Sequence, residues 1–232
     1  MISHDKKFVF VHVPKTAGTS LRNALIDKSY DFGGDANLFL QSKHWYLSAY
    51  YHFFADYFDR SLFVNTSVHP LDYYYKFSII RNPWDRMVSY FLYAFLKRSD
   101  EKFLSFLKRV KLVKDLSKDL LIFPRFRGFV GLDYGRCDAK LFDDCIHYNV
   151  LSKAYYEEYL PKVDRFLRFE TVEPDYQALC IDLRIDYKPL PYINKNKNRT
   201  RYQDYYNDET INLVADIFDN EINIFKYNYE AV

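Results

Sequence analysis

The segment FVFVHVPKTAGTS, residues 8–20, constrains the fold of this chain more than any other. It begins with a short continuous apolar run, residues 8–13, which is typical of a strand buried on both faces of a parallel sheet. The run changes abruptly into a polar loop, and a helical pattern over residues 20–28 follows, with Thr19 or Ser20 as its N-cap. This order predicts an α/β fold with the loop at the carboxyl edge of the sheet.

A second strand–turn–helix unit is predicted at YYYKFSIIRNPWDRMVSYFLYAFLK. Residues 75–80 form an apolar strand-like run, and apolar residues recur with helical period over residues 84–97. Between the two, Asn82 is a favourable N-cap, Pro83 suits the first helical position, and Asp85 can close a capping box. The turn therefore lies at the same edge of the sheet as the first loop.

The rest of the chain continues this alternation without repeats or clear linkers. A further strand is predicted at residues 164–169, and further helices at residues 44–58, within 98–125, at 153–159, at 174–183 and after Asn207 or Asp208. The last helix carries one apolar stripe of Ile211, Val214, Phe218, Ile222 and Phe225. The pattern predicts one three-layer α/β domain over residues 1–232, with a central parallel sheet flanked by helices.

Charge, hydropathy and cysteine usage exclude several classes of protein. With 33 basic and 31 acidic residues the net charge is +2, which disfavours a nucleic-acid binder. No apolar run approaches the roughly 20 residues that span a bilayer, and the first residues do not resemble a signal peptide. Three widely spaced cysteines with no CxxC pair indicate reduced thiols and a cytoplasmic location. The oligomeric state is left open.

The first loop has the chemistry of an anion-binding site. Backbone N–H groups at the start of a helix attract an anion, and Lys15 adds a full positive charge. Gly18 lets the backbone come close to a ligand, and hydroxyl donors lie on both sides of it. The residues predicted to hold a terminal phosphate are Lys15, Thr16, Ala17, Gly18, Thr19 and Ser20.

The loop does not follow the Walker A pattern GxxxxGK[ST]. In that pattern the lysine follows the glycine and directly precedes the Ser or Thr that holds magnesium. Here Lys15 precedes Gly18 by three residues, and no strand ending in aspartate clearly offers a Walker B partner. A nucleoside-triphosphate hydrolase is therefore disfavoured.

Two motifs carry a resemblance to a known family. PKTAGTS followed by FSIIRNPWDRMVSYF resembles the cofactor-binding motifs of sulfotransferases that use 3′-phosphoadenosine 5′-phosphosulfate (PAPS). The chain is most similar to the carbohydrate branch, whose first motif is usually written PKTGGTS, and VDRFLRFE and PYINKNKN extend the similarity through most of the chain. The resemblance implies a P-loop-like fold and places Arg81 and Ser89 at the 3′-phosphate, where a guanidinium fork fits a phosphate bidentately.

The same resemblance implies a mechanism. An acceptor oxygen attacks the sulfur in line while charge builds on the leaving phosphate oxygen, so catalysis consists of positioning and electrostatics. Lys15 neutralises the leaving oxygen, and 3′-phosphoadenosine 5′-phosphate (PAP) is the product. No metal is expected to be required, because the transferred group carries one negative charge fewer than a phosphoryl group.

The acceptor hydroxyl needs a general base, and histidine suits this role near neutral pH. The resemblance places a histidine between the two motifs, often after a lysine, which selects His44. His52 and His69 are alternatives, because the residues that follow His44 depart from the family pattern. His12 lies inside the predicted first strand and is interpreted as a core residue.

A basic run near the carboxyl end resembles the segment that closes over PAPS in this group. Lys195, Lys197 and Arg199 are predicted to contact the 3′-phosphate or an acidic glycan, and a solvated basic loop is the alternative. Glu170 matches the Phe-Glu position of the family, where a structural role is expected.

The leading hypothesis is a sulfotransferase that moves a sulfuryl group from PAPS to a hydroxyl of a carbohydrate or glycoconjugate and releases PAP. The alternatives are a nucleotide kinase that uses ATP and magnesium, and a PAP-binding protein without catalysis. The sequence leaves the acceptor and the sulfated position open.

Overall fold

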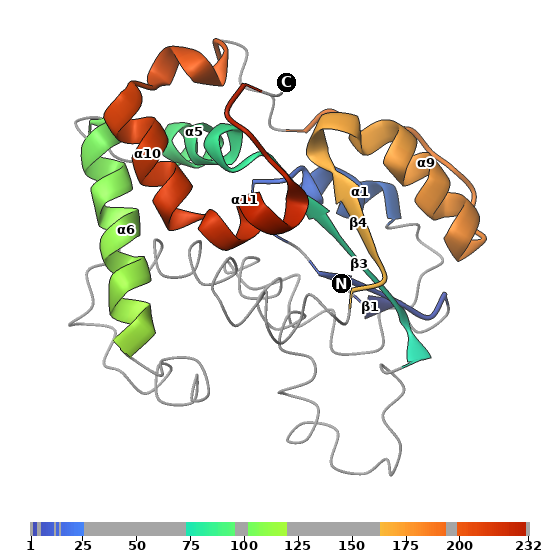
Figure 1. Ribbon diagram of the computed structural model, residues 1–232. Helices are drawn as coiled ribbons and strands as arrows, with labels where there is room; N and C mark the ends of the chain where they lie inside the picture. Colours follow the sequence, from blue (N-terminus) through green and yellow to red (C-terminus); the bar gives the residue numbers. More distant parts are fainter. Residues whose placement is uncertain are drawn as a thin grey trace, which may run out of the picture. The chain divides into compact units, whose positions relative to one another are not determined.

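The chain divides into two compact units, each built from two separate stretches (Figure 1). Unit 1 comprises Met1–Arg81 and Tyr159–Lys197, and unit 2 comprises Asn82–Glu158 and Asn198–Val232. The computed structural model describes residues 2–3, 6–11, 13, 15–25, 73–95, 102–119, 163–193 and 199–230. The single domain over residues 1–232 stays a prediction.

Unit 1 contains a four-stranded sheet in the order β1-β2-β3-β4. The strands are β1 (Ile2–Ser3), β2 (Phe8–Val11), β3 (Tyr75–Ile80) and β4 (Arg165–Arg168). β1 is antiparallel to β2, whereas β2, β3 and β4 are mutually parallel. The predicted α/β fold with a parallel sheet flanked by helices is confirmed, and β1 adds a short antiparallel edge.

One face of this sheet forms the core of unit 1 together with two helices, α1 (Gly18–Leu25) and α9 (Val172–Leu183). Alternate strand residues point to this face, as the period of two along a strand requires. The buried cluster consists of Phe8, Phe10, Leu21, Leu25, Phe77, Ile79, Leu167, Tyr176, Leu179, Cys180, Leu183 and Leu190. Because both helices contribute to one cluster, they lie on the same side of the sheet.

Unit 2 is helical in its described part. Its elements are α5 (Pro83–Phe95), α6 (Phe103–Asp119), a 3₁₀ turn η5 (Tyr202–Tyr205), α10 (Asp208–Ile217) and α11 (Asp219–Phe225). Aromatic rings pack edge to face between α5 and α6, with 5.1 Å between the ring centroids of Tyr90 and Phe106 and the same distance between Phe91 and Phe103. These contacts bury the apolar stripe predicted for the second strand–turn–helix unit. None of the described helices combines the length and apolar character needed to cross a bilayer.

Several predicted boundaries shift in the structure. β2 ends at Val11 instead of continuing to residue 13, and the carbonyl of Val13 accepts a hydrogen bond from the following loop. The predicted strand at 164–169 ends at Arg168, and Phe169 begins a 3₁₀ turn, η4 (Phe169–Thr171). The single last helix is wrong as predicted: it is divided at Phe218 into α10 and α11.

Other predictions are confirmed or lie outside the described residues. β3 has the predicted bounds, Pro83 begins α5, and Asn207 caps α10 through a capping box with Thr210. Within the predicted helical region 98–125 the structure describes α6. The helices predicted at residues 44–58 and 153–159 fall on residues that are not described.

Candidate active site

The loop that follows β2 has a backbone that alternates in handedness. Lys15 and Ala17 lie in the left-handed region, with φ of 65° and 66°, whereas Thr16 and Gly18 have negative φ. Such alternation turns successive N–H groups toward one side and forms a concave nest that binds anions. Residues 15–18 are called the anion loop below. Their geometry fits a terminal phosphate or sulfate.

The anion loop runs directly into the first turn of α1. The amide of Leu21 donates to the carbonyl of Ala17 at 3.1 Å, so the helix begins at Gly18. The prediction that Thr19 or Ser20 caps this helix is therefore wrong, since both lie inside its first turn. Their backbone N–H groups belong to the first turn of the helix. The N–H groups of a first turn have no hydrogen-bond partner within the helix and can therefore bind an anion.

Thr16 stabilises the loop from within. Its side-chain hydroxyl donates to the carbonyl of Val13 at 2.8 Å, and the residue is completely buried. A deprotonated phosphate oxygen only accepts hydrogen bonds, and the Thr16 hydroxyl proton is already engaged. Any contribution of Thr16 to ligand binding therefore comes from its backbone N–H group.

Arg81 follows β3 and contacts the anion loop directly. Its Nη1 atom donates to the carbonyl oxygen of Lys15 at 2.8 Å. The guanidinium carbon lies 3.8 Å from the centroid of the Phe169 ring, and Arg81 is only 4% exposed. The ends of three parallel strands therefore meet in one cluster of Lys15, Arg81 and Phe169, at the edge predicted for ligand binding.

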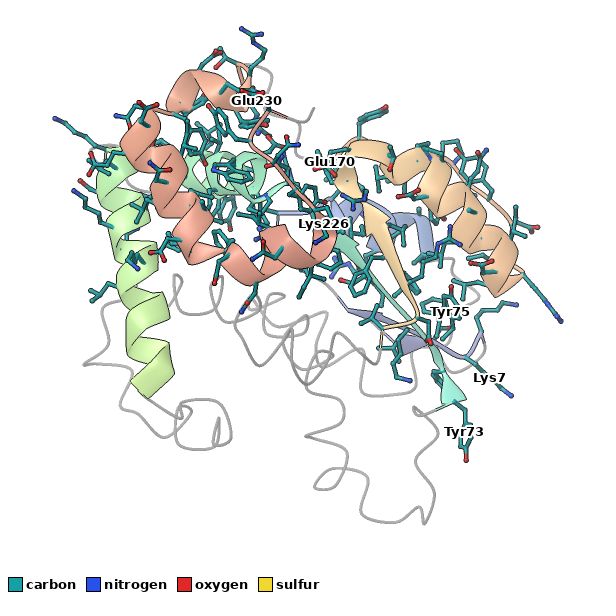
Figure 2. The ribbon with its side chains drawn as sticks, viewed as in Figure 1. Lys7, Tyr73, Tyr75, Glu170, Lys226 and Glu230 are labelled. Carbon is teal, nitrogen blue, oxygen red and sulfur yellow. The ribbon has the colours of Figure 1, made fainter. Side chains whose placement is uncertain are left out.

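The carboxyl ends of the parallel strands and their amino ends lie at opposite edges of the sheet. Glu170, next to Phe169, lies at the carboxyl end of β4, and Tyr75, Tyr73 and Lys7 lie at the opposite end (Figure 2). At that opposite end Asp182 accepts a hydrogen bond from Tyr75 at 3.2 Å and pairs with Arg165. The anion loop is therefore remote from this surface cluster within unit 1.

The start of α5 in unit 2 carries the second half of the Arg-Asn-Pro motif. The Oδ1 atom of Asn82 accepts from the amides of Trp84 at 3.0 Å and Asp85 at 3.4 Å, which confirms it as the N-cap. Its side-chain amide also donates to the carbonyl of Asn228 at 3.0 Å. The Asp85 carboxylate accepts a hydrogen bond from Arg199.

This ion pair fixes the end of the predicted basic run to α5. Arg199 also donates to the backbone carbonyl of Asp85 at 3.2 Å, and both side chains are about four-fifths buried. Arg199 was predicted as a cofactor contact. The structure places it against a carboxylate of α5, and a contact with cofactor stays a prediction.

The aromatic residues Trp84, Tyr206 and Tyr229 form a cluster at the start of α5. The Tyr206 hydroxyl donates to the carbonyl of Trp84 at 2.9 Å, and the indole N–H of Trp84 donates to the carbonyl of Ile211 at 3.1 Å. Desolvation raises the pKa of the Tyr206 phenol well above its ordinary value, and the neighbouring Tyr229 and Asp85 add to the shift. The phenol therefore stays neutral and keeps donating to α5 well above neutral pH.

The remaining predicted site residues lie in different units or outside the described residues. Ser89 is a half-buried residue of α5 and belongs to unit 2, whereas Arg81 belongs to unit 1. Their joint contact with one phosphate stays a prediction. The candidate histidines His44, His52 and His69 and the lysines Lys195 and Lys197 all lie outside the described residues, as does His12, which was interpreted as a core residue.

Sequence reasoning missed Phe169. The Phe-Glu dipeptide directed attention to Glu170, which is exposed, whereas the ring of its neighbour Phe169 contacts Arg81. The signal was the position of an aromatic residue directly after a parallel strand, next in the sheet to the strand that ends at Arg81.

Comparison with known proteins identifies the family of the chain. A family model described as "Sulfotransferase family" matches residues 1–228, which include the anion loop, Arg81 and Ser89. No curated protein and no solved structure matches the chain. Among the described residues no group of three or more His, Cys, Asp or Glu could hold a metal ion. The chain therefore belongs to the sulfotransferase family, whose enzymes take a sulfuryl group from PAPS and release PAP.

Proposed function

We propose that this sulfotransferase transfers the sulfuryl group to a hydroxyl of a carbohydrate or glycoconjugate. The observation that carries the donor half of the proposal is the alternating backbone of the anion loop, with Lys15 in it and Arg81 bonded to it. The carbohydrate acceptor is supported by the similarity of PKTAGTS, VDRFLRFE and PYINKNKN to the carbohydrate branch of the family.

The anion loop and the first turn of α1 would hold the 5′-phosphosulfate. Backbone N–H groups of residues 15–20 point at the anion, and the Lys15 ammonium neutralises the oxygen that bridges phosphorus and sulfur. Arg81 and Ser89 are assigned to the 3′-phosphate, with Lys195, Lys197 and Arg199 as further contacts.

The reaction would then need one proton acceptor. The acceptor oxygen forms a bond to sulfur as the bond from sulfur to the phosphate oxygen breaks, and the electron pair stays on PAP. His44 is proposed to take the hydroxyl proton, with His52 and His69 as alternatives. A cytoplasmic location is proposed from the cysteine pattern; of the three cysteines the structure describes Cys180, as a buried free thiol.

The donor half is tested by removing the lysine of the anion loop. Lys15→Ala is expected to lower the turnover with radiolabelled PAPS by at least about a hundredfold, because electrostatic groups at the leaving oxygen have effects of that size. Lys108→Ala makes the same change of charge at an exposed position of α6 and should leave turnover unchanged. Equal turnover of Lys15→Ala and wild type would contradict the assignment.

The assignment of a carbohydrate acceptor is tested separately, with a panel of acceptor substrates. Neutral and acidic oligosaccharides are compared with 4-nitrophenol and with tyrosine peptides, using the wild-type enzyme and labelled PAPS. Transfer to an oligosaccharide hydroxyl at the highest kcat/KM is expected. A preference for the phenolic acceptors would overturn the carbohydrate assignment and leave the PAPS-dependent activity intact.

A further inference from the structure

We infer that Arg81 is a positioning residue for the 5′-phosphosulfate loop, in addition to any contact it makes with the 3′-phosphate. The inference rests on the proposed function, because it takes the anion loop as the 5′ binding element. It assigns a second role to an arginine that the sequence motif connects only with the other phosphate.

The contact of Arg81 with the loop is made through the backbone of Lys15. Nη1 lies 2.8 Å from the Lys15 carbonyl oxygen, and Lys15 has a φ of 65°. A residue other than glycine costs about 1 kcal/mol or more in this left-handed region and stays there only where its surroundings hold it. The charged hydrogen bond from Arg81 supplies such a restraint at the residue that carries the catalytic ammonium group.

The same bond determines the direction of a binding group. In a planar trans peptide the C=O and N–H bonds point in opposite directions. When Arg81 fixes the Lys15 carbonyl, it also fixes the N–H of Thr16, which belongs to the same peptide unit. This N–H is one of the donors of the nest, and the Thr16 side chain is held separately by the Val13 carbonyl. Arg81 therefore orients a donor that it does not touch.

Phe169 completes the arrangement by holding Arg81. The guanidinium stacks on the Phe169 ring at 3.8 Å, and the arginine is almost fully buried. A planar guanidinium can stack on an aromatic face and donate in its own plane at the same time, whereas a lysine ammonium cannot. The arrangement therefore requires arginine at position 81 and an aromatic side chain at position 169.

Two ligands that differ only in the 3′-phosphate separate the two roles of Arg81. PAP carries both phosphates, and adenosine 5′-monophosphate (AMP) lacks the one at the 3′ position. Affinities are measured by ligand-observed NMR titration, which reports weak and tight binding, for wild type, Arg81→Lys, Arg81→Met and Phe169→Leu. Arg165→Met serves as a control, because it removes an arginine that pairs with Asp182 at the opposite edge of the sheet in the same unit.

If Arg81 positions the anion loop, its substitution should weaken the binding of AMP as well as that of PAP. Both Arg81 variants should weaken AMP by about tenfold, the loss expected for one charged hydrogen bond. Phe169→Leu should weaken AMP at least threefold, as expected from the loss of a cation–π contact. Arg165→Met should change neither affinity. Thermal unfolding establishes that each variant is folded at the assay temperature, and Phe169→Leu decides the matter if the Arg81 variants do not fold.

Other results overturn the inference in distinguishable ways. If the Arg81 variants weaken PAP but change the affinity for AMP less than twofold, Arg81 serves the 3′-phosphate alone. If wild type binds PAP but not AMP, the anion loop contributes no measurable ligand affinity, and Arg81 cannot influence binding through the loop. In both cases the proposed function stands. If wild type binds neither ligand, the proposed function fails together with the inference.

Discussion

The guanidinium of Arg86 and the carboxylate of Glu221 form a doubly hydrogen-bonded pair inside unit 2. The two bonds, from Nη1 to Oε1 and from Nη2 to Oε2, are 2.6 and 2.5 Å long, and both side chains are 1% exposed. The centroid of the Phe218 ring lies 4.9 Å from the guanidinium carbon of Arg86. This pair connects α5, which begins at Pro83 of the second motif, to α11, the last described helix.

Breaking this pair on one side should strongly destabilise the protein. Glu221→Gln leaves the buried Arg86 charge without its counter-ion, and losses of about 3 kcal/mol in the free energy of unfolding are typical of such changes. Urea denaturation measures the loss. Glu209→Gln is the control, because Glu209 pairs with Lys108 at 3.2 Å on the surface and such pairs contribute less than about 1 kcal/mol. Equal losses in the two variants would contradict this difference.

Ala17→Gly should slightly stabilise the protein. Ala17 has a φ of 66°, a conformation that costs alanine about 1 kcal/mol or more and glycine almost nothing. The greater entropy of glycine in the unfolded chain offsets part of this gain, which leaves an expected increase of about 0.5 kcal/mol. Ala24→Gly, within α1, should instead cost about 1 kcal/mol. Loss of stability in both variants would show that Ala17 is not held in the left-handed region in solution.

The Tyr206 phenol should make stability sensitive to alkaline pH. Its pKa is raised in the folded state, so the folded protein favours the protonated form. This contribution is fully present below the unfolded-state pKa of about 10 and is lost as the pH rises above it. Tyr206→Phe should cost about 1 kcal/mol near neutral pH, since its hydrogen bond to the Trp84 carbonyl is lost, and should weaken the decline above about pH 10.

Urea midpoints at neutral and alkaline pH check this prediction. Tyr205→Phe is the matched control, because it removes a hydroxyl from the adjacent residue and should leave the alkaline decline in place. Equal declines in wild type and Tyr206→Phe would assign the alkaline sensitivity to other groups.

Ser89→Ala tests the 3′-phosphate assignment. If the hydroxyl donates to that phosphate, PAP affinity should fall by about tenfold while AMP affinity stays constant, because AMP lacks the group that Ser89 would bind. Ser105→Ala, at an exposed position of α6, should alter neither affinity. A parallel loss for PAP and AMP would place Ser89 elsewhere in the site or in the packing of α5.

The elements predicted best are those with strong local signals. β3 has the predicted bounds because its apolar run is bounded by an arginine and a helix cap, and α5 begins at Pro83 because Asn82 satisfies the first amides. The start of α1 was misplaced because Ala17 adopts a left-handed conformation that its side chain does not announce. Likewise, nothing local indicates that the last apolar stripe is divided at Phe218.

The sequence by itself determined the family, the parallel-strand architecture and the candidate anion loop, because each is indicated by short motifs and by the local periodicity of apolar residues. Only the tertiary structure decided which partners the charged residues take. Arg81 bonds to the backbone of Lys15 and stacks on Phe169, Arg86 pairs with Glu221, and Arg199 pairs with Asp85. These partners lie far apart in sequence, and an arginine can pair with any carboxylate, carbonyl or aromatic ring that the fold brings within reach.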